Sequence, residues 1–128
     1  VFVSSGLGTE KELKATASEL PDAIWMACTS EYPCDRSRTW YSGQPGFSDH
    51  TMGHDVAVQL VTRGCWFFEK HVTFSRHCYG SDARFATEPD EFEQYVRGLQ
   101  KAIEVPKTGG LRVVSEQTRK DFLWTSDT

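Results

Sequence analysis

The segment from Asp49 to Asp55 carries two histidines and two aspartates within seven residues. Imidazole and carboxylate groups at this density are ligands that a divalent metal accepts. A His-x3-His pair shares one face of a helix, but Gly53 lies between these two histidines and argues against a helix. The candidate metal ligands are therefore His50, His54 and Asp49, and the simpler alternative is a polar loop whose aspartates bind nearby backbone amides.

A second group of chemically capable side chains comprises Glu69, His71, Arg76 and His77. A carboxylate or imidazole can remove a 2'-hydroxyl proton, an arginine can stabilise a pentacoordinate phosphorane, and a histidine can protonate the leaving oxygen. These four residues are thus the candidate catalytic set of a ribonuclease-like hydrolase. The alternative is that they lie on the solvated face of an amphipathic strand.

The chain contains four cysteines, Cys28, Cys34, Cys65 and Cys78. An even number of cysteines in a small chain favours disulfides formed in an oxidising compartment. The sequence spacing suggests pairs 28–34 and 65–78, although other connectivities and four free buried thiols stay open. A structural zinc site is disfavoured because neither pair has the tight spacing of zinc ligands.

The overall composition limits the class of protein. With 128 residues, 38% hydrophobic residues and a mean hydropathy of -0.49, the chain fits one soluble globular domain over 1–128. A net charge of -4 and scattered basic residues argue against nucleic-acid binding, except as an RNA substrate of the hydrolase alternative. The chain lacks an apolar run long enough for a membrane helix and a nucleotide-binding motif, so we expect neither membrane insertion nor a cofactor.

The elements that must position these residues begin with a helix over 9–20. Thr9 and Glu12 form a capping-box signature, and Pro21 ends the helix. An apolar run predicts a buried strand over 24–28, and a second strand is expected over 38–42 around Trp40 and Tyr41. The glycine-rich segment 43–53 is predicted to be a loop.

Hydrophobic alternation predicts an extended segment over 56–62, and strands are expected over 65–68 and 72–75. The adjacent residues Phe67 and Phe68 must then point to opposite faces. Apolar positions with helical spacing, Pro89 in the first turn and acidic residues at the start predict a helix over 88–104. A last strand over 111–114 and docking of the aromatic tail at 122–124 complete the prediction.

These elements predict an α+β fold, in which a mostly antiparallel sheet of about five strands packs against the long helix beside a short N-terminal helix. A small β-barrel with a helix is the alternative. The favoured function is a small secreted, disulfide-containing protein that binds a protein partner without catalysis, such as a pathogen effector or virulence factor. The alternatives are the secreted ribonuclease-like hydrolase and a periplasmic immunity or inhibitor protein that neutralises a basic enzyme.

Overall fold

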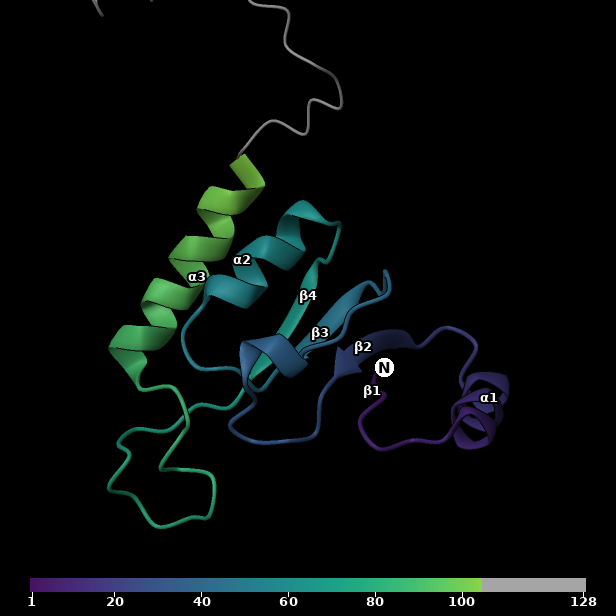
Figure 1. The fold of residues 1–128 in the computed structure, drawn as a ribbon, viewed down its shortest axis with the longest axis horizontal. Helices are drawn as coiled ribbons and strands as arrows, with labels where there is room; N and C mark the ends of the chain where they lie inside the picture. Colours follow the sequence, from purple (N-terminus) through teal and green to yellow (C-terminus); the bar gives the residue numbers. More distant parts are fainter. Residues whose placement is uncertain (105–128) are drawn as a thin grey trace, which may run out of the picture.

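The computed structural model describes residues 1–104, and it contains a sheet of four parallel strands (Figure 1). The spatial order of the strands follows their order in the chain. The strands are β1 (Phe2–Ser4), β2 (Ile24–Cys28), β3 (Gly46–Asp49) and β4 (Phe67–Lys70). Because all four are parallel, the residues that follow them gather along one edge of the sheet.

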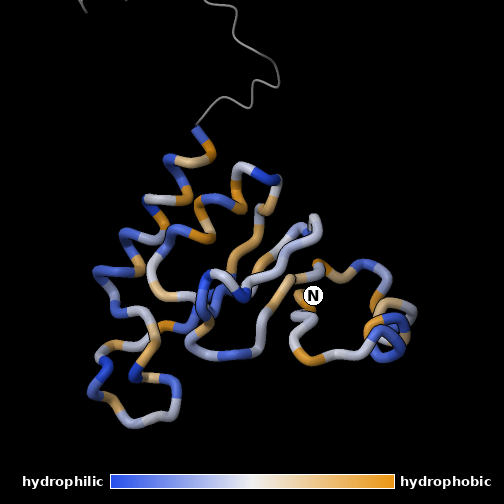
Figure 2. The backbone as a smooth tube through the Cα atoms, viewed as in Figure 1, coloured by the Kyte–Doolittle hydropathy of each residue, from blue (hydrophilic) through white to orange (hydrophobic). Residues whose placement is uncertain are grey.

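Helical segments lie between the strands and after β4. They are α1 (Glu10–Glu19), the short 3-10 helix η1 (Arg36–Arg38), α2 (Asp55–Thr62) and α3 (Pro89–Glu104). Figure 1 shows α2 and α3 side by side against one side of the sheet, whereas α1 stands apart near β2. Figure 2 shows that α1 is largely hydrophilic, and none of its residues is buried.

The two sides of the sheet differ because successive residues of a strand point in opposite directions. The register pairs Phe47 with Phe68 and Asp49 with Lys70, so these four side chains share the side that faces α2 and α3. We call it the helix-facing side. Its core contains Ala27, Phe47, Leu60 and Cys65, with Phe68 packed against them. The opposite side carries Ser48, Phe67 and Glu69.

Gly46 begins β3, where a side chain would collide with the Met26 side chain. A Cβ atom at this position would lie 2.1 Å from the Met26 sulfur and 3.2 Å from the Trp25 carbonyl oxygen. Met26 itself is buried on the neighbouring strand. The glycine therefore allows β2 and β3 to pair while Met26 lies over their shared surface.

Three predicted elements are confirmed. The helix α1 has the expected capping box, in which the Thr9 side chain accepts from the Glu12 amide and the Glu12 carboxylate accepts from the Thr9 amide. The strand β2 spans the predicted residues, and α3 begins at Pro89, one residue after the predicted start. Phe67 and Phe68 also lie on opposite sides of β4, as predicted.

The predicted antiparallel five-strand sheet is wrong, because every pairing in the described residues is parallel. The segment 56–62 is helical, since Ala57, Leu60 and Val61 form one buried face with helical spacing. The predicted loop 43–53 contains β3, whereas 38–42 and 72–75 form no named strand. The alternative of a small closed barrel is also wrong for the described strands, because β1 and β4 are the two edge strands of an open sheet. The predictions for 111–114 and 122–124 lie outside the described residues.

The predicted disulfides are also wrong, because all four cysteines are free. Cys65 is fully buried in the core on the helix-facing side, whereas Cys78 is exposed in the connection between β4 and α3. Cys28 ends β2, and the Cys34 amide donates to the His50 carbonyl in a separate loop contact. The inference of an oxidising compartment depended on these disulfides and loses its basis.

Among residues 1–104, every helix is too short or too polar to cross a membrane.

Candidate functional site

Two histidines meet at the carboxyl ends of adjacent strands. His50 directly follows β3, and His71 directly follows β4. Since the residues before them, Asp49 and Lys70, are register partners, the two imidazoles are placed next to each other. Their ring centroids are 5.2 Å apart and their planes meet at 83°. A pair separated by twenty residues of sequence thus becomes one local group.

Tyr32 packs against both imidazoles. Its ring centroid lies 4.4 Å from that of His71 and 5.2 Å from that of His50, and Phe85 contributes a further edge contact at 6.2 Å. Burial raises the pKa of the Tyr32 hydroxyl, and the carboxylates of Asp82 and Glu69 raise it further. Tyr32 therefore retains a neutral hydroxyl, which can both donate and accept a hydrogen bond near the histidines.

The two histidines differ in their polar partners. His71 Nδ1 lies 3.6 Å from an Asp82 carboxylate oxygen. His50 Nδ1 is buried and has no hydrogen-bond partner within the described part of the chain. A buried polar atom without a partner carries a desolvation cost, and a ligand that binds the imidazole would relieve it.

This arrangement can hold a divalent transition metal through two imidazoles. No group of three metal-ligating side chains occurs among residues 1–104, so this part of the chain supplies two imidazoles to such an ion. The unpartnered nitrogen of His50 and the adjacent ring of His71 fit such a role. The carboxylate of Asp82 beside His71 is the type of partner that orients a metal-binding imidazole.

A buried polar group lies on the helix-facing side of the same strand ends. The Asp49 carboxylate accepts hydrogen bonds from the Thr51 amide and hydroxyl at 2.9 and 2.6 Å and from the Tyr95 hydroxyl at 3.0 Å. Lys70 Nζ lies 3.4 Å from the same carboxylate and donates to the Thr51 carbonyl. Burial raises the pKa of Tyr95 far above its usual range, and the Asp49 charge adds to this effect. The Tyr95 hydroxyl therefore stays protonated and donates a hydrogen bond to Asp49.

The predicted metal set of His50, His54 and Asp49 is not brought together. His54 precedes α2 and packs against α3, where a Cβ at Gly98 would lie 3.0 Å from its ring. Asp49 is occupied by its contacts on the helix-facing side. Of the three residues, His50 alone joins the imidazole pair.

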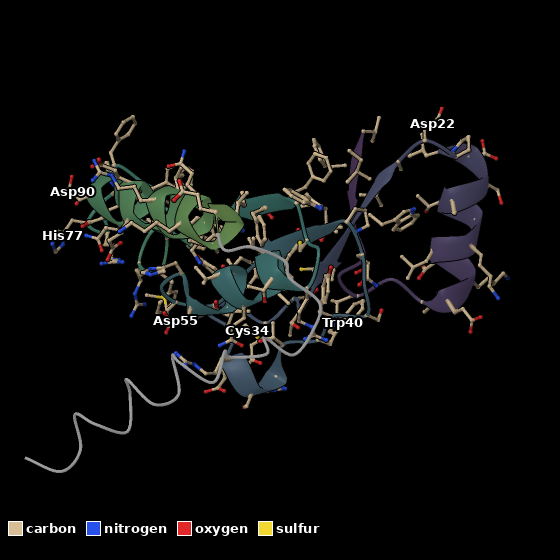
Figure 3. The ribbon with its side chains drawn as sticks, turned by 90° about the horizontal axis from the view of Figure 1, so that it is seen from above. Asp22, Cys34, Trp40, Asp55, His77 and Asp90 are labelled. Atoms are coloured by element: carbon tan, nitrogen blue, oxygen red, sulfur yellow. The ribbon has the colours of Figure 1, made fainter. Side chains whose placement is uncertain are left out.

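The predicted catalytic set is divided in the same way. His71 belongs to the imidazole pair, and Glu69 lies two residues earlier on β4. Arg76 is anchored at the start of α3, where its guanidinium lies 2.6 Å from the Glu91 carboxylate and donates to the Ala86 carbonyl. This contact lowers the pKa of Glu91 and raises that of Arg76. His77 is exposed, and Figure 3 shows it near Asp90 at the outer end of the molecule.

The sequence interpretation missed Tyr32, Lys70 and Tyr95. A usable signal was present for His71, which follows the apolar run 65–68 and the charged residues Glu69 and Lys70. In parallel sheets, residues after the carboxyl ends of strands are those that bind ligands. An antiparallel interpretation placed the two histidines in different sites and concealed this signal.

An apolar groove of about 920 Å³ runs beside β4 and α3. Phe67 lines it from the sheet, Phe92 and Val96 line it from the helix, and Glu69 and Lys70 lie on its wall. The imidazole pair is not among the lining residues, so the groove is distinct from the histidine site.

Comparison with known proteins gives consistent matches. Residues 1–109 match the model of the NeuB family. A pseudaminic acid synthase of Campylobacter jejuni is 30% identical over 116 residues, which cover 79% of this chain and 34% of that protein. An N,N'-diacetyllegionaminic acid synthase of the same species is 27% identical over 142 residues, covering 95% and 41%.

A crystal structure of an N-acetylneuraminic acid (sialic acid) synthetase from Leptospira borgpetersenii, in complex with citrate, has a TM-score of 0.73. It is 23% identical, and the match covers 98% of this chain and 49% of that one. The likeness supports the parallel fold. The chain spans less than half the length of each of these three proteins.

These matches overturn the predicted function. The relatives are sugar-biosynthesis enzymes, so the secreted binding protein or effector, the ribonuclease-like hydrolase and the periplasmic immunity protein are all wrong. The expectation of a protein without catalytic activity is wrong for the same reason, and so is the secreted or periplasmic location. The protein partner and the single domain over 1–128 stay predictions.

Proposed function

The chain belongs to the NeuB family, and on that premise we propose that it forms part of the active site of a synthase that makes a sugar acid. The observation that carries the proposal is the pair His50 and His71 at adjacent carboxyl ends of parallel strands, with an unpartnered buried nitrogen on His50. The named products of the relatives, pseudaminic and diacetyllegionaminic acid, supply the class of product.

The imidazole pair is proposed to hold one divalent transition metal. Such an ion, when bound, polarises a carbonyl or hydroxyl oxygen of the substrate as a Lewis acid. Residues 1–104 supply two ligands, and substrate oxygens are proposed to fill further coordination positions. His50 gains a partner for its buried nitrogen, and His71 is oriented by the Asp82 carboxylate 3.6 Å away.

Tyr32 is proposed to contact the sugar. Its ring packs against both imidazoles, and its neutral hydroxyl can bind a sugar oxygen. An aromatic ring beside polar groups is also a suitable surface for the C–H face of a sugar. Together these residues can bind and orient a polyhydroxylated substrate next to the imidazole pair.

The metal component is tested by titrating Mn²⁺, and separately Zn²⁺, into the full chain by isothermal titration calorimetry. We expect one site in the unmodified chain and at least a 100-fold loss of affinity in His50→Ala and in His71→Ala. His77→Ala is the matched control, because His77 is exposed and separate from the pair, and it should bind as the unmodified chain does. Equal affinity in all four proteins would contradict the proposal.

The sugar component is tested with N-acetylneuraminate as the probe. We expect the metal-loaded chain to bind it and Tyr32→Ala to weaken that binding about tenfold, since the ring and hydroxyl are both removed. Tyr79→Ala, at a fully exposed position, is the control. The absence of saturable binding to the metal-loaded chain would oppose assignment of the sugar site to these residues.

A further inference from the structure

The buried polar group on the helix-facing side lies directly behind the imidazoles, because Asp49 and Lys70 each precede one of the two histidines. We infer that Asp49, Lys70 and Tyr95 form a positioning network that sets the separation of His50 and His71, an inference that rests on the proposed metal role of that pair. The network would act through the backbone of the two strand ends.

Alternation along the strands places the network opposite the site. Asp49 and His50 are consecutive, as are Lys70 and His71, and in extended chain consecutive side chains point to opposite sides. Each imidazole therefore follows a residue whose side chain is held on the helix-facing side. Fixing Asp49 relative to Lys70 fixes the two backbone positions from which the imidazoles project.

Contacts to Thr51 hold the backbone on both sides of His50. The Asp49 carboxylate accepts from the Thr51 amide at 2.9 Å and from its hydroxyl at 2.6 Å, so a tight turn is closed around His50. Lys70 donates to the Thr51 carbonyl from the neighbouring strand. The chain at His50 is thus tied to the residue that precedes His71.

Tyr95 completes the network from α3. Its hydroxyl donates to the remaining Asp49 oxygen at 3.0 Å, and Lys70 Nζ lies 5.2 Å from the centre of its ring. Tyr95 is buried, and both charged partners are nearly inaccessible, with 0% of the Asp49 side chain and 6% of the Lys70 side chain exposed. The helix layer is therefore connected to both strand ends.

The energetics favour positioning as the role of this group. Burying an aspartate and a lysine removes both charges from water, and well-packed apolar residues of similar volume stabilise a fold as well or better. Stability alone therefore gives little reason for an ion pair at this place. A better reason is that directional hydrogen bonds define the geometry of the two strand ends.

The inference is tested by measuring Mn²⁺ affinity of the full chain by calorimetry, at a temperature where each variant is folded by circular dichroism. We expect Tyr95→Phe to weaken binding roughly tenfold and Lys70→Met to weaken it 10- to 100-fold. Tyr79→Phe is the matched control, because it removes the same hydroxyl at an exposed position. The visible spectrum of the Co²⁺-loaded chain should change in Tyr95→Phe and stay unchanged in Tyr79→Phe.

Tyr95→Phe removes one oxygen atom and keeps the ring, so this variant tests the network even if Lys70→Met fails to fold. A lower melting temperature with unchanged affinity and spectrum in Tyr95→Phe would overturn the inference and leave the metal site standing. If the unmodified chain binds no metal, the proposed metal site fails first and the inference falls with it. The two failures are therefore distinguishable.

Discussion

At the carboxyl ends of β3 and β4, the two sides of the sheet differ in how well their polar groups are paired. On the helix-facing side, Asp49 and Lys70 are buried and every polar atom of Asp49 has a partner. On the side of the site, His50 has an unpartnered nitrogen and His71 is only partly buried. Consecutive residues therefore differ: Asp49 has hydrogen-bond partners for its carboxylate, whereas the next residue, His50, has a nitrogen that can bind a ligand. The comparison shows how a parallel sheet can support a reactive site from behind.

The largest expected effect on stability comes from removing the buried carboxylate on the helix-facing side. Asp49→Ala leaves Lys70 buried without its charged partner, and we expect the free energy of unfolding to fall by about 3–5 kcal/mol. Urea unfolding followed by circular dichroism measures this loss. A loss below about 1 kcal/mol would mean that water reaches Lys70 in the folded chain.

The adjacent phenylalanines of β4 give the next comparison. Phe68 packs against the core on the helix-facing side, whereas Phe67 is 39% exposed on the opposite side. We expect Phe68→Ala to cost about 3 kcal/mol of unfolding free energy and Phe67→Ala about 1 kcal/mol. Thermal and urea unfolding of the two variants in parallel measure the difference, and equal losses would contradict the assignment of the two sides.

A substitution in the imidazole pair should affect metal binding more than it affects the stability of the fold. His71→Ala removes ring contacts with Tyr32 and His50, which we expect to cost about 1 kcal/mol of unfolding free energy. Metal affinity should nevertheless fall at least 100-fold. Urea unfolding in the presence of EDTA, paired with calorimetry, separates the two effects. A stability loss as large as that of Asp49→Ala would remove the contrast between the two sides.

The smallest effect concerns the ion pair between Arg76 and Glu91, which is partly exposed. Arg76→Gln should lower the free energy of unfolding by about 0.5 kcal/mol at pH 7. Folding lowers the pKa of Glu91 below its ordinary value of 4.5, so the stabilisation is complete above pH 4.5. It is lost as the pH falls through the lower pKa of the folded chain.

The difference between Arg76→Gln and the unmodified chain should therefore shrink in acid. Urea unfolding of both proteins at pH 7 and near pH 3 measures it. A difference that grows as the pH falls would contradict the assigned direction of the Glu91 pKa shift.

Local signals explain which elements could be predicted from sequence. The capping residues of α1 and the amphipathic pattern of α3 lie within each segment, so both helices were identified correctly. The segment 56–62 also fits alternation through Val56, Val58 and Leu60, but the sheet buries Ala57, Leu60 and Val61 instead. Strands of three to five residues are too short for periodicity to reveal whether they pair parallel or antiparallel.

The site was accessible from sequence only in fragments. His50 and His71 were both selected for their chemistry, but they were assigned to different sites because pairing between β3 and β4 is not a local property. Tyr95 comes from a helix 46 residues after Asp49, and its pattern indicates only a core position. Such long-range neighbours follow from topology, which the residue pattern alone did not determine.

The exposed helix α1 has a consequence for motion. It has no buried residue, and its capping hydrogen bonds join residues of the helix to its own cap. Local opening of α1 therefore costs little apolar burial, whereas opening β3 must separate a packed core. Backbone amides of α1 should exchange with deuterium long before those of β3, and a protease would cut this helix while the strand ends that carry the histidines stay intact.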